Sequence, residues 1–215
     1  MTNTLEDMRA RLRDQLADTE DETWNAGEKD DVLLWAVRKL NQRLNKPIDP
    51  EAAAASITLA TGDYFYAIDS SITQLVRVDY IDSDSYEQGP LTTGWEIVGD
   101  LIDGTAKLHV SPTIVEQGGT LRLIAYGRYT LTTQTAAQTN AVPDDYVTLV
   151  LALSRAEAYR RLVSNRARFE QWQVSNQVQN ISVNELLQMV SEADRQAEDE
   201  WMSLKRWQKP VMGRI

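Results

Sequence analysis

The sequence predicts an α+β protein in which a helical bundle is built from both ends of the chain and a small antiparallel β-sandwich or barrel is inserted between them. Hydrophobic residues recur with a helical period before about residue 50 and after about residue 143, and they alternate as in strands between about residues 56 and 130. Neither pair of helices can bury its apolar stripe alone, so we expect the chain ends to pack together. The expected domains are residues 1–52, the N-terminal helices; residues 53–142, the inserted β domain; and residues 143–215, the C-terminal helices with an extended tail.

Two helices are expected in the N-terminal segment. The first covers residues 3–17, because Thr4 and Asp7 have the spacing of a capping box ahead of an apolar stripe. The second covers about residues 29–45, where six residues share a helical face: Val32, Leu33, Ala36, Val37, Leu40 and Leu44. The proline-containing stretch "KPIDP" ends it, since proline cannot continue the helical hydrogen-bond ladder.

Five or six strands are expected in the middle of the chain. In "LVRVDYI" the alternation places Val76, Val78 and Tyr80 on one face, and "AKLHV" and "TLRLIAYGRYTL" also read as strands. The glycines of "EQGG" predict a hairpin turn, and "DGTA" and "EQGPLTTG" predict further turns. Five or six strands are enough to form a small antiparallel sandwich or open barrel.

Two long helices are expected after the polar linker "TTQTAAQTN". The first, residues 144–172, begins with the apolar stretch "YVTLVLAL", which is too apolar for a surface helix and predicts the central element of the bundle. We expect Leu149, Val150 and Leu153 to pack against the second N-terminal helix, and the basic end of a helix about 40 Å long to extend past its neighbours. The second, residues 183–208, begins at a capping box made by Ser182 and Glu185.

Composition excludes several classes of protein. Hydrophobic residues make up 42% of the 215 residues, no apolar run is long enough to span a bilayer, and the first residues lack a signal-peptide core, so we expect a soluble chain without membrane contact. The absence of cysteine excludes disulfides and thiolate chemistry. The net charge of −10 argues against a nucleic-acid binder but is compatible with a protein that DNA passes without binding.

No convincing catalytic set, metal site or cofactor motif is present, so we expect neither enzymatic activity nor a cofactor. The single histidine, His109, lies in a predicted strand and is expected to face solvent. The stretch "DSDS" at residues 82–85 lacks the glycine and the final glutamate of a calcium loop and predicts a polar turn. Asp144 and Asp145 are expected to start a helix.

Tryptophan and arginine near the ends of the C-terminal helices point to protein–protein contacts, because buried interfaces are enriched in both residues. Five arginines fall within fourteen residues of each other: Arg155, Arg160, Arg161, Arg166 and Arg168. We expect Arg155, Arg161 and Arg168 to form ion pairs, within the chain or between subunits, with an acidic run made of Asp18, Glu20, Asp21 and Glu22. A solvated helix face and a nucleic-acid patch remain alternatives.

Two further surfaces are expected to contact partners. Ile114 and Val115 lie in "TIVEQGG", at the expected tip of a hairpin, where apolar side chains need a partner surface such as a neighbouring subunit or the next ring. The alternative is that both side chains fold back onto the sandwich. The C-terminal segment combines apolar and cationic side chains that suit a groove with an acidic rim. Its expected contact residues are Trp201, Lys205, Arg206, Trp207, Lys209, Met212, Arg214 and Ile215.

The order of these segments resembles the head–tail adaptor proteins (neck or head-completion connectors) of tailed bacteriophages. The resemblance rests on "ATGDYFYAID", "ITQLVRVDYIDSDSYE", "TGWEIVGD", "LHVSPTIVEQGGTLRLIAYGRYTL" and "VPDDYVTLVLALSRAEAYRRL", in this order. It implies a structural virion protein, made in the host cytoplasm, that forms a homo-oligomeric ring, typically of twelve copies, and connects the portal to the tail. The implied partners are the portal, the next neck or tail protein, and the DNA that passes through the channel.

Two alternative functions stay open from the sequence. One is an enzyme on an unfamiliar scaffold, and the other is a binding module. A β-sandwich carried on a helical stem is also typical of carbohydrate-binding or receptor-binding modules, which use exposed aromatic side chains on one β face. Tyr64, Tyr66, Tyr80 and Tyr86 are the candidates for such a face.

Overall fold

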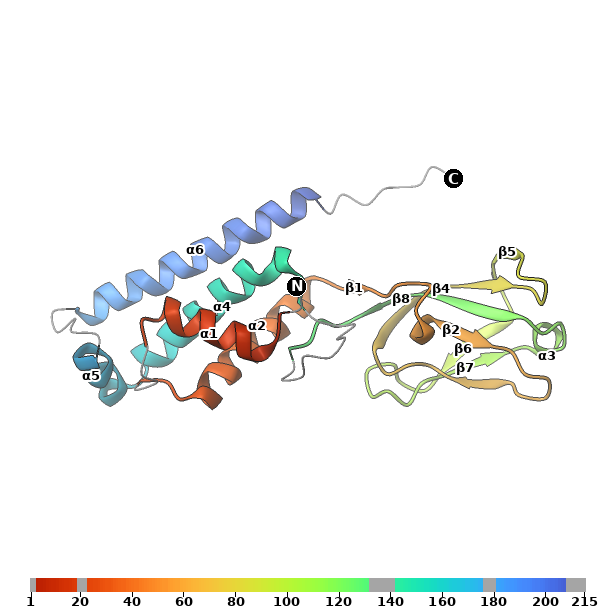
Figure 1. Cartoon of the computed structure of the whole chain (residues 1–215), viewed down its shortest axis with the longest axis horizontal. Helices are drawn as coiled ribbons and strands as arrows, with labels where there is room; N and C mark the ends of the chain where they lie inside the picture. Colours follow the sequence, from red (N-terminus) through yellow and green to blue (C-terminus); the bar gives the residue numbers. More distant parts are fainter. Residues whose placement is uncertain (1–2, 19–22, 132–141, 176–180, 208–215) are drawn as a thin grey trace. The chain divides into compact units, whose positions relative to one another are not determined.

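The structure is a computed structural model, and it describes residues 3–18, 23–131, 142–175 and 181–207 (Figure 1). The chain divides into two compact units. Residues 1–43 and 130–215 form the first, which we call the helical unit, and residues 44–129 form the second, which we call the β unit. The expected mixture of helix and antiparallel strand is confirmed.

The helical unit contains five described helices: α1 (Leu5–Gln15), α2 (Ala26–Arg43), α4 (Asp144–Val163), α5 (Arg166–Ser175) and α6 (Val183–Trp207). The predicted capping boxes are both present. Thr4 Oγ1 accepts a hydrogen bond from the Asp7 backbone N–H at 3.1 Å, and the Ser182 N–H donates to Glu185 Oε2 at 2.6 Å. An unpredicted box made by Asn25 and Glu28 starts α2 earlier than expected. Each box satisfies backbone N–H groups that the first helical turn leaves without a partner.

Helix α4 is the central element of the helical unit, as its apolar sequence predicts. It contacts all four other described helices of the unit. Leu149 and Val150 are fully buried, as are Leu33 and Leu40 on α2, but Leu153 is only half-buried. The expectation that Leu153 lies inside the core is therefore only partly correct, because this position is at the boundary between the buried and solvent-facing sides of α4.

The expected continuous helix from 144 to 172 is wrong, because the chain breaks at Ser164 and Asn165 into α4 and α5. Ser164 Oγ donates to the Arg161 carbonyl oxygen at 2.8 Å, and Asn165 Oδ1 accepts from the Arg168 N–H at 3.2 Å. Serine and asparagine favour such local bonds over helix continuation. The break lets the apolar side of α5 turn inward, which leaves Trp172 only 4% exposed.

The β unit contains eight described strands and two short helical segments. The strands are β1 (Lys46–Pro47), β2 (Ser56–Thr58), β3 (Phe65–Ala67), β4 (Ile72–Ile81), β5 (Glu87–Pro90), β6 (Trp95–Val98), β7 (Lys107–Val110) and β8 (Thr120–Gly127); the helical segments are η1 (Ala53–Ala55) and α3 (Pro112–Val115). One antiparallel sheet has the order β1-β8-β4-β5, with β2 also paired to β8, and a second has the order β3-β7-β6. The stretch "EQGP", expected to be a turn, is strand β5.

The core of the β unit is formed by aliphatic side chains of both sheets, with Leu108, Leu121 and Leu123 fully buried. Val78 and Tyr80 face it as predicted, but Val76 is 52% exposed. The pairing of β4 with β8 shifts register between Leu75 and Arg77, and this irregularity reverses the alternation ahead of it. The expectation that Val76 shares the buried face is wrong for this reason.

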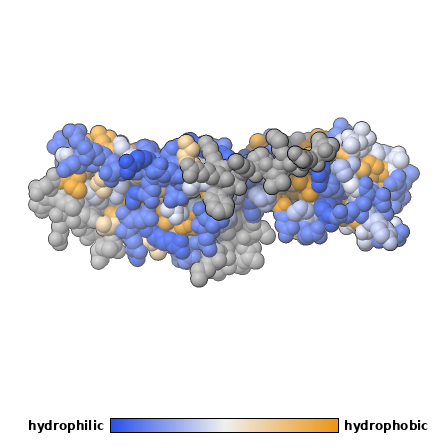
Figure 2. All heavy atoms as spheres, turned by 90° about the horizontal axis from the view of Figure 1, so that it is seen from above, coloured by the Kyte–Doolittle hydropathy of each residue, from blue (hydrophilic) through white to orange (hydrophobic). Residues whose placement is uncertain are grey.

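Two further observations complete the fold. Among the residues described here, no helix is both long enough and apolar enough to cross a membrane. On the face shown in Figure 2, hydrophilic residues cover most of the described surface, and hydrophobic residues form small separate patches.

Candidate assembly surfaces

A buried ion pair fixes the junction between α1 and α2. Lys29 Nζ lies 2.7 Å from Asp18 Oδ2, and the two side chains are 0% and 1% exposed. The same carboxylate accepts backbone N–H bonds from Thr23 at 3.0 Å and Trp24 at 3.2 Å. A buried charge is tolerated only when it is paired and hydrogen-bonded, so this arrangement holds both chain segments in place.

The sequence predicted an arginine as the partner of Asp18, but in the structure Asp18 pairs with Lys29. Its lysine partner is the first charged residue of the stretch "KDD", and no sequence pattern distinguishes this lysine from a solvated one. Glu20, Asp21 and Glu22 lie outside the described residues.

The three arginines expected to pair with the acidic run have other partners within the chain. Arg161 Nε lies 3.1 Å from Glu157 Oε1 one turn earlier on α4. Arg168 on α5 forms an ion pair with Glu28 on α2. The third of these arginines, Arg155, forms a hydrogen bond with an amide of α6, described next. Helix packing therefore gives Asp18 and these three arginines other partners within the chain, and it does not pair them with one another.

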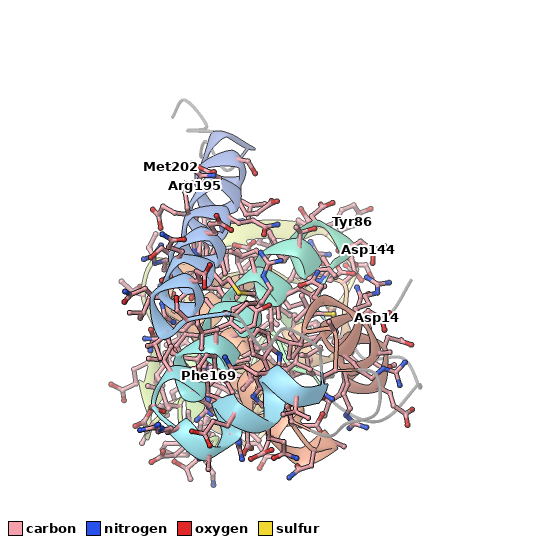
Figure 3. The ribbon with its side chains drawn as sticks, turned by 90° about the vertical axis from the view of Figure 1, so that its left-hand side faces the viewer. Asp14, Tyr86, Asp144, Phe169, Arg195 and Met202 are labelled. Atoms are coloured by element: carbon pink, nitrogen blue, oxygen red, sulfur yellow. The ribbon has the colours of Figure 1, made fainter. Side chains whose placement is uncertain are left out.

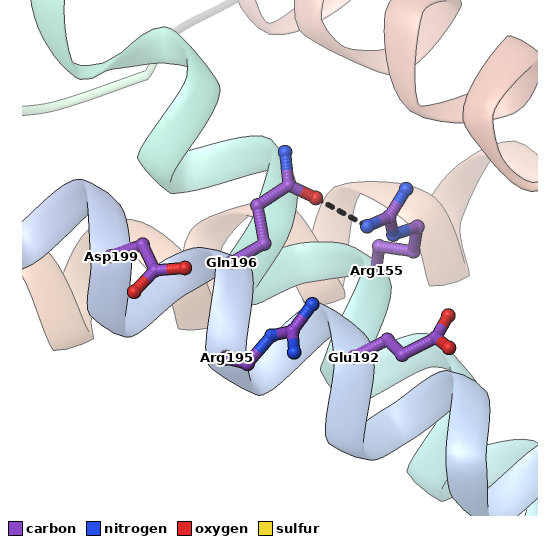
Figure 4. A pocket seen from close by; sticks show the side chains of 5 residues that line it. All are labelled: Arg155, Glu192, Arg195, Gln196 and Asp199. Carbon is purple, nitrogen blue, oxygen red and sulfur yellow. Dashed lines mark hydrogen bonds between the residues drawn. The ribbon is translucent and has the colours of Figure 1, made fainter.

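A surface pocket of about 340 Å³ lies between α4 and α6 (Figure 4). Its lining residues are Arg155 of α4 and Glu192, Arg195, Gln196 and Asp199 of α6. Arg155 Nη2 donates to Gln196 Oε1 at 2.5 Å. Two guanidinium groups and two carboxylates balance each other, so the pocket presents no net charge to a small ion, and it lies along the polar seam that joins the two helices.

A second contact on the same seam is an ion pair. Arg160 Nη2 donates to both carboxylate oxygens of Asp194, at 2.5 and 2.6 Å, and so links α4 to α6. Both bonds come from one guanidinium nitrogen, and the two side chains are 42% and 44% exposed, so the pair contributes only modestly to stability. Arg155 and Arg160 of α4 therefore have their partners on α6, at the solvent-exposed border of the helix contact.

The C-terminal half of α6 carries part of the predicted contact surface. Trp201 is 4% exposed, and the Arg43 guanidinium carbon lies 5.0 Å from the centroid of its ring. Trp201, which the sequence offered as a partner-contact residue or as part of the bundle packing, is thus packed within the helical unit, because helix α6 turns it toward α2. The neighbouring Met202, which the sequence did not single out, is 52% exposed, and it lies along α6 with Arg195, away from Asp14 on α1 (Figure 3).

The remaining C-terminal contact residues stay predictions. Lys205, Arg206 and Trp207 belong to the last turn of α6, but their side chains are outside the described set. Lys209, Met212, Arg214 and Ile215 lie outside the described residues altogether.

The structure does not place Ile114 and Val115 at an exposed hairpin tip. They belong to the short helix α3, with Val115 fully buried and Ile114 packed partly buried against the core of the β unit. The N-terminal Pro112 begins this helix, and the helical turn directs the two side chains inward. Both side chains thus fold back onto the β unit, and the core covers the apolar surface on which the expected contact depended.

The four candidate tyrosines do not form one aromatic face. Tyr80 is buried and donates its hydroxyl to the Gly118 carbonyl oxygen at 3.0 Å, and the Tyr66 hydroxyl donates to the Asp63 carbonyl oxygen at 2.7 Å. Tyr64 packs partly buried against the core, whereas Tyr86 is 69% exposed. This distribution counts against the carbohydrate-binding alternative, which needs several exposed rings together.

The stretch at residues 82–85 forms a turn, as predicted. The Asp82 carboxylate accepts backbone N–H bonds from Tyr86 at 2.9 Å and Asp84 at 3.0 Å, and a bond from Gln88 Nε2 at 2.7 Å. These bonds, the Tyr86 bond most of all, lower the pKa of Asp82. Within the described segments, no group of three or more histidine or acidic side chains is arranged to hold a metal ion.

His109 lies on the outer face of the three-stranded sheet. Its Nδ1 is 3.1 Å from Glu96 Oε1, and its ring centroid is 4.8 Å from that of Phe65. The side chain is 32% exposed, in agreement with a strand histidine that faces outward.

These features define an α+β protein whose helical unit is made from both chain ends. Ion pairs within that unit connect α1 with α2, α2 with α5, and α4 with α6. A sequence profile of the SU10 adaptor protein family matches residues 3–208 and thus includes both units. The chain belongs to this family, which is a family of phage head–tail adaptors, and the resemblance noted in the sequence is confirmed. A search of curated proteins found no match.

Proposed function

We propose that the chain is a structural virion protein that forms a ring, connects the portal of the capsid to the tail and lines the channel through which DNA passes. The observation that carries this proposal is the family match over residues 3–208, because it extends over both compact units. The expected partners are further copies of the chain, the portal and the next neck or tail protein.

The charge of the chain supports a channel role. Each copy carries a formal net charge of −10, so a ring of twelve copies would carry about −120. Such a wall repels the phosphate backbone and lets DNA pass without binding. The ion pair of Arg160 on α4 with Asp194 on α6 neutralises one arginine within the chain, which further reduces the cationic surface available to DNA.

The division of the chain supports the proposed architecture of a helical bundle from both ends with a β domain inserted between them. The helical unit combines residues before 44 with residues after 129, and α4 contacts the other four described helices of that unit. A rigid helical unit made in this way suits attachment to one partner, while the β unit is free to contact another.

The C-terminal segment is the proposed portal contact. Met202 is exposed close to it, and the following residues up to 215 include Lys205, Arg206, Lys209 and Arg214. Cationic and apolar side chains together fit a groove with an acidic rim. Because Trp201 is buried, the contact is expected to begin after this residue.

The experiment that tests the proposal measures ring formation and portal binding separately. The purified chain, with and without the portal of the same phage, is examined by mass photometry and negative-stain electron microscopy. Ring-shaped oligomers that dock on the portal support the proposal. A chain that stays monomeric with and without portal, and binds neither portal nor tail protein, overturns it.

A truncated chain tests the C-terminal contact. Deletion of residues 208–215 should leave the far-ultraviolet circular dichroism spectrum unchanged and abolish portal binding. The charge reversals Lys205→Glu and Arg206→Glu should weaken binding in a salt-dependent way. The matched control is Arg166→Glu, because Arg166 is 92% exposed on α5 and its reversal should not change portal affinity. If the truncated chain binds the portal with wild-type affinity, the portal contact lies elsewhere on the helical unit.

A further inference from the structure

The three-stranded sheet of the β unit has two open edges. Strands β3 and β6 flank β7, and within the described part of the chain each pairs with β7 alone. Both are antiparallel to β7, so β3 and β6 run in the same direction. An open strand edge presents a row of backbone donors and acceptors to a partner.

The hydrogen-bond pattern shows which residues of β6 point to the open side. The Ser111 N–H donates to the Gly94 carbonyl oxygen at 2.8 Å, so Gly94 and the alternate residues Glu96 and Val98 direct their backbone groups toward β7. The backbone groups of the intervening residue Ile97 therefore face away from β7.

The same reasoning applies to β3. The Val110 N–H donates to the Tyr64 carbonyl oxygen at 2.9 Å, which directs the backbone of Tyr64 and Tyr66 toward β7. The backbone groups of Phe65 and Ala67 face the open side. The two edges thus offer complementary rows of N–H and C=O groups.

These edges lack the protection present in the five-stranded sheet. The end strands of that sheet contain Pro47 in β1 and Pro90 in β5, and proline removes a backbone donor from an edge. Strand β6 has no proline or lysine and exposes Ile97 (36%) and Val98 (44%), while Phe65 on β3 is 56% exposed. Exposed apolar edges of this kind are sites for strand pairing.

We infer that β6 of one copy pairs in parallel with β3 of a second copy, so that the three-stranded sheets of successive copies join head to tail. In the joined sheet, Phe65 of the second copy lies on the same face as Glu96 and Val98 and covers the exposed Val98. The contact uses a different patch on each copy, and such contacts generate closed rings when the rotation between copies allows closure. The inference rests on the proposed ring and specifies one of the surfaces that builds it.

A proline substitution tests the edge without removing bonds to β7. Ile97→Pro deletes an N–H that faces the open side, and proline is tolerated at such positions of edge strands. The matched control Ile97→Thr keeps the N–H and a β-branched side chain. We expect Ile97→Pro to raise the concentration needed for half-maximal assembly at least tenfold, the control to change it less than threefold, and both melting temperatures to stay within a few degrees of wild type.

Cysteine cross-linking provides a second measurement that does not depend on the proline variant folding. The natural chain has no cysteine, so Phe65→Cys and Val98→Cys introduce the only thiols. The two single variants are mixed under oxidising conditions, at assembling concentration or on the portal. We expect disulfide-linked dimers in the mixture and none with either variant alone. A double variant carrying both substitutions should give a ladder of covalent oligomers.

The outcomes separate this inference from the proposed function. Dimers formed by Val98→Cys alone indicate a twofold contact between β6 strands and overturn the inference. If the wild-type chain forms rings but the mixed cysteine variants give no cross-link and Ile97→Pro assembles normally, the inference is also overturned, and the ring function is left to other surfaces. A chain that forms no oligomer and binds no portal overturns the proposed function, and this inference with it.

Discussion

The buried pair of Asp18 and Lys29 gives the sharpest test of the helical unit. Lys29→Met leaves a buried carboxylate with two backbone donors but no counter-ion, and Asp18→Asn leaves a buried ammonium group facing a neutral amide. Both side chains are at most 1% exposed, so solvent does not replace the lost partner. Removing one member of a buried pair costs about 3–5 kcal/mol of the free energy of unfolding. This is a large part of the roughly 5–15 kcal/mol that stabilises a typical domain.

The double variant makes the argument quantitative. Asp18→Asn combined with Lys29→Met removes both charges and keeps an amide oxygen that can accept the Thr23 N–H. Its cost should be smaller than the sum of the single costs, by a coupling energy of about 0.5–3 kcal/mol. Replacing the carboxylate by leucine instead would leave the N–H groups of residues 23 and 24 without an acceptor, at about 1–3 kcal/mol each.

Chemical unfolding followed by circular dichroism at the helical band measures these values. The control is Arg166→Gln, which breaks an exposed ion pair on α5 with Glu170 and should cost less than about 1 kcal/mol. A Lys29→Met variant as stable as this control, or single costs that simply add, would show that the pair does not hold the α1–α2 junction.

Four further outcomes follow from the structure. Ala17, the residue after the C-cap of α1, has φ 53°, and Ala17→Gly should stabilise the helical unit by about 0.5–1 kcal/mol in the same unfolding experiment. Gly119 has φ 91° and an added Cβ would overlap the backbone of β4, so Gly119→Ala should lower the melting temperature of the β unit or prevent its folding. Leu149→Ala should lower the free energy of unfolding by about 2–5 kcal/mol, and Leu153→Ala, at a half-buried position one turn along, should lower it by clearly less. The lowered pKa of Asp82 stabilises the fold above its unfolded value of about 3.9, and this contribution should disappear as pH falls through the lower folded value; a carboxyl titration by NMR that gives an ordinary pKa would contradict it.

Local signals in the sequence were sufficient for the starts of two helices. Thr4 with Asp7, and Ser182 with Glu185, form the expected capping boxes because each bond joins groups only three residues apart. The apolar stretch of α4 likewise predicted its central place, since a helix that is apolar on all sides needs neighbours on all sides.

The boundaries of the strands were harder to predict from periodicity alone. Alternation assigned Val76 to the buried face, but the shifted pairing with β8 exposes it. The residues of strand β5 were predicted to form a turn because glycine and proline usually indicate one. Proline is nevertheless compatible with an edge strand. Both errors arise from the partner strand, whose register is not encoded in the segment itself.

The sequence by itself determined the mixed α+β class, the capping boxes of α1 and α6, and the family to which the chain belongs, because these depend on local periodicity, short-range hydrogen bonds and the order of segments. Only the tertiary structure decided that Lys29 is buried against Asp18, that Trp201 lies under Arg43 and is not exposed, and that β3 and β6 are left open. A side chain's burial and a strand's free edge depend on which distant segment packs beside it, and charged or apolar residue types do not specify that neighbour.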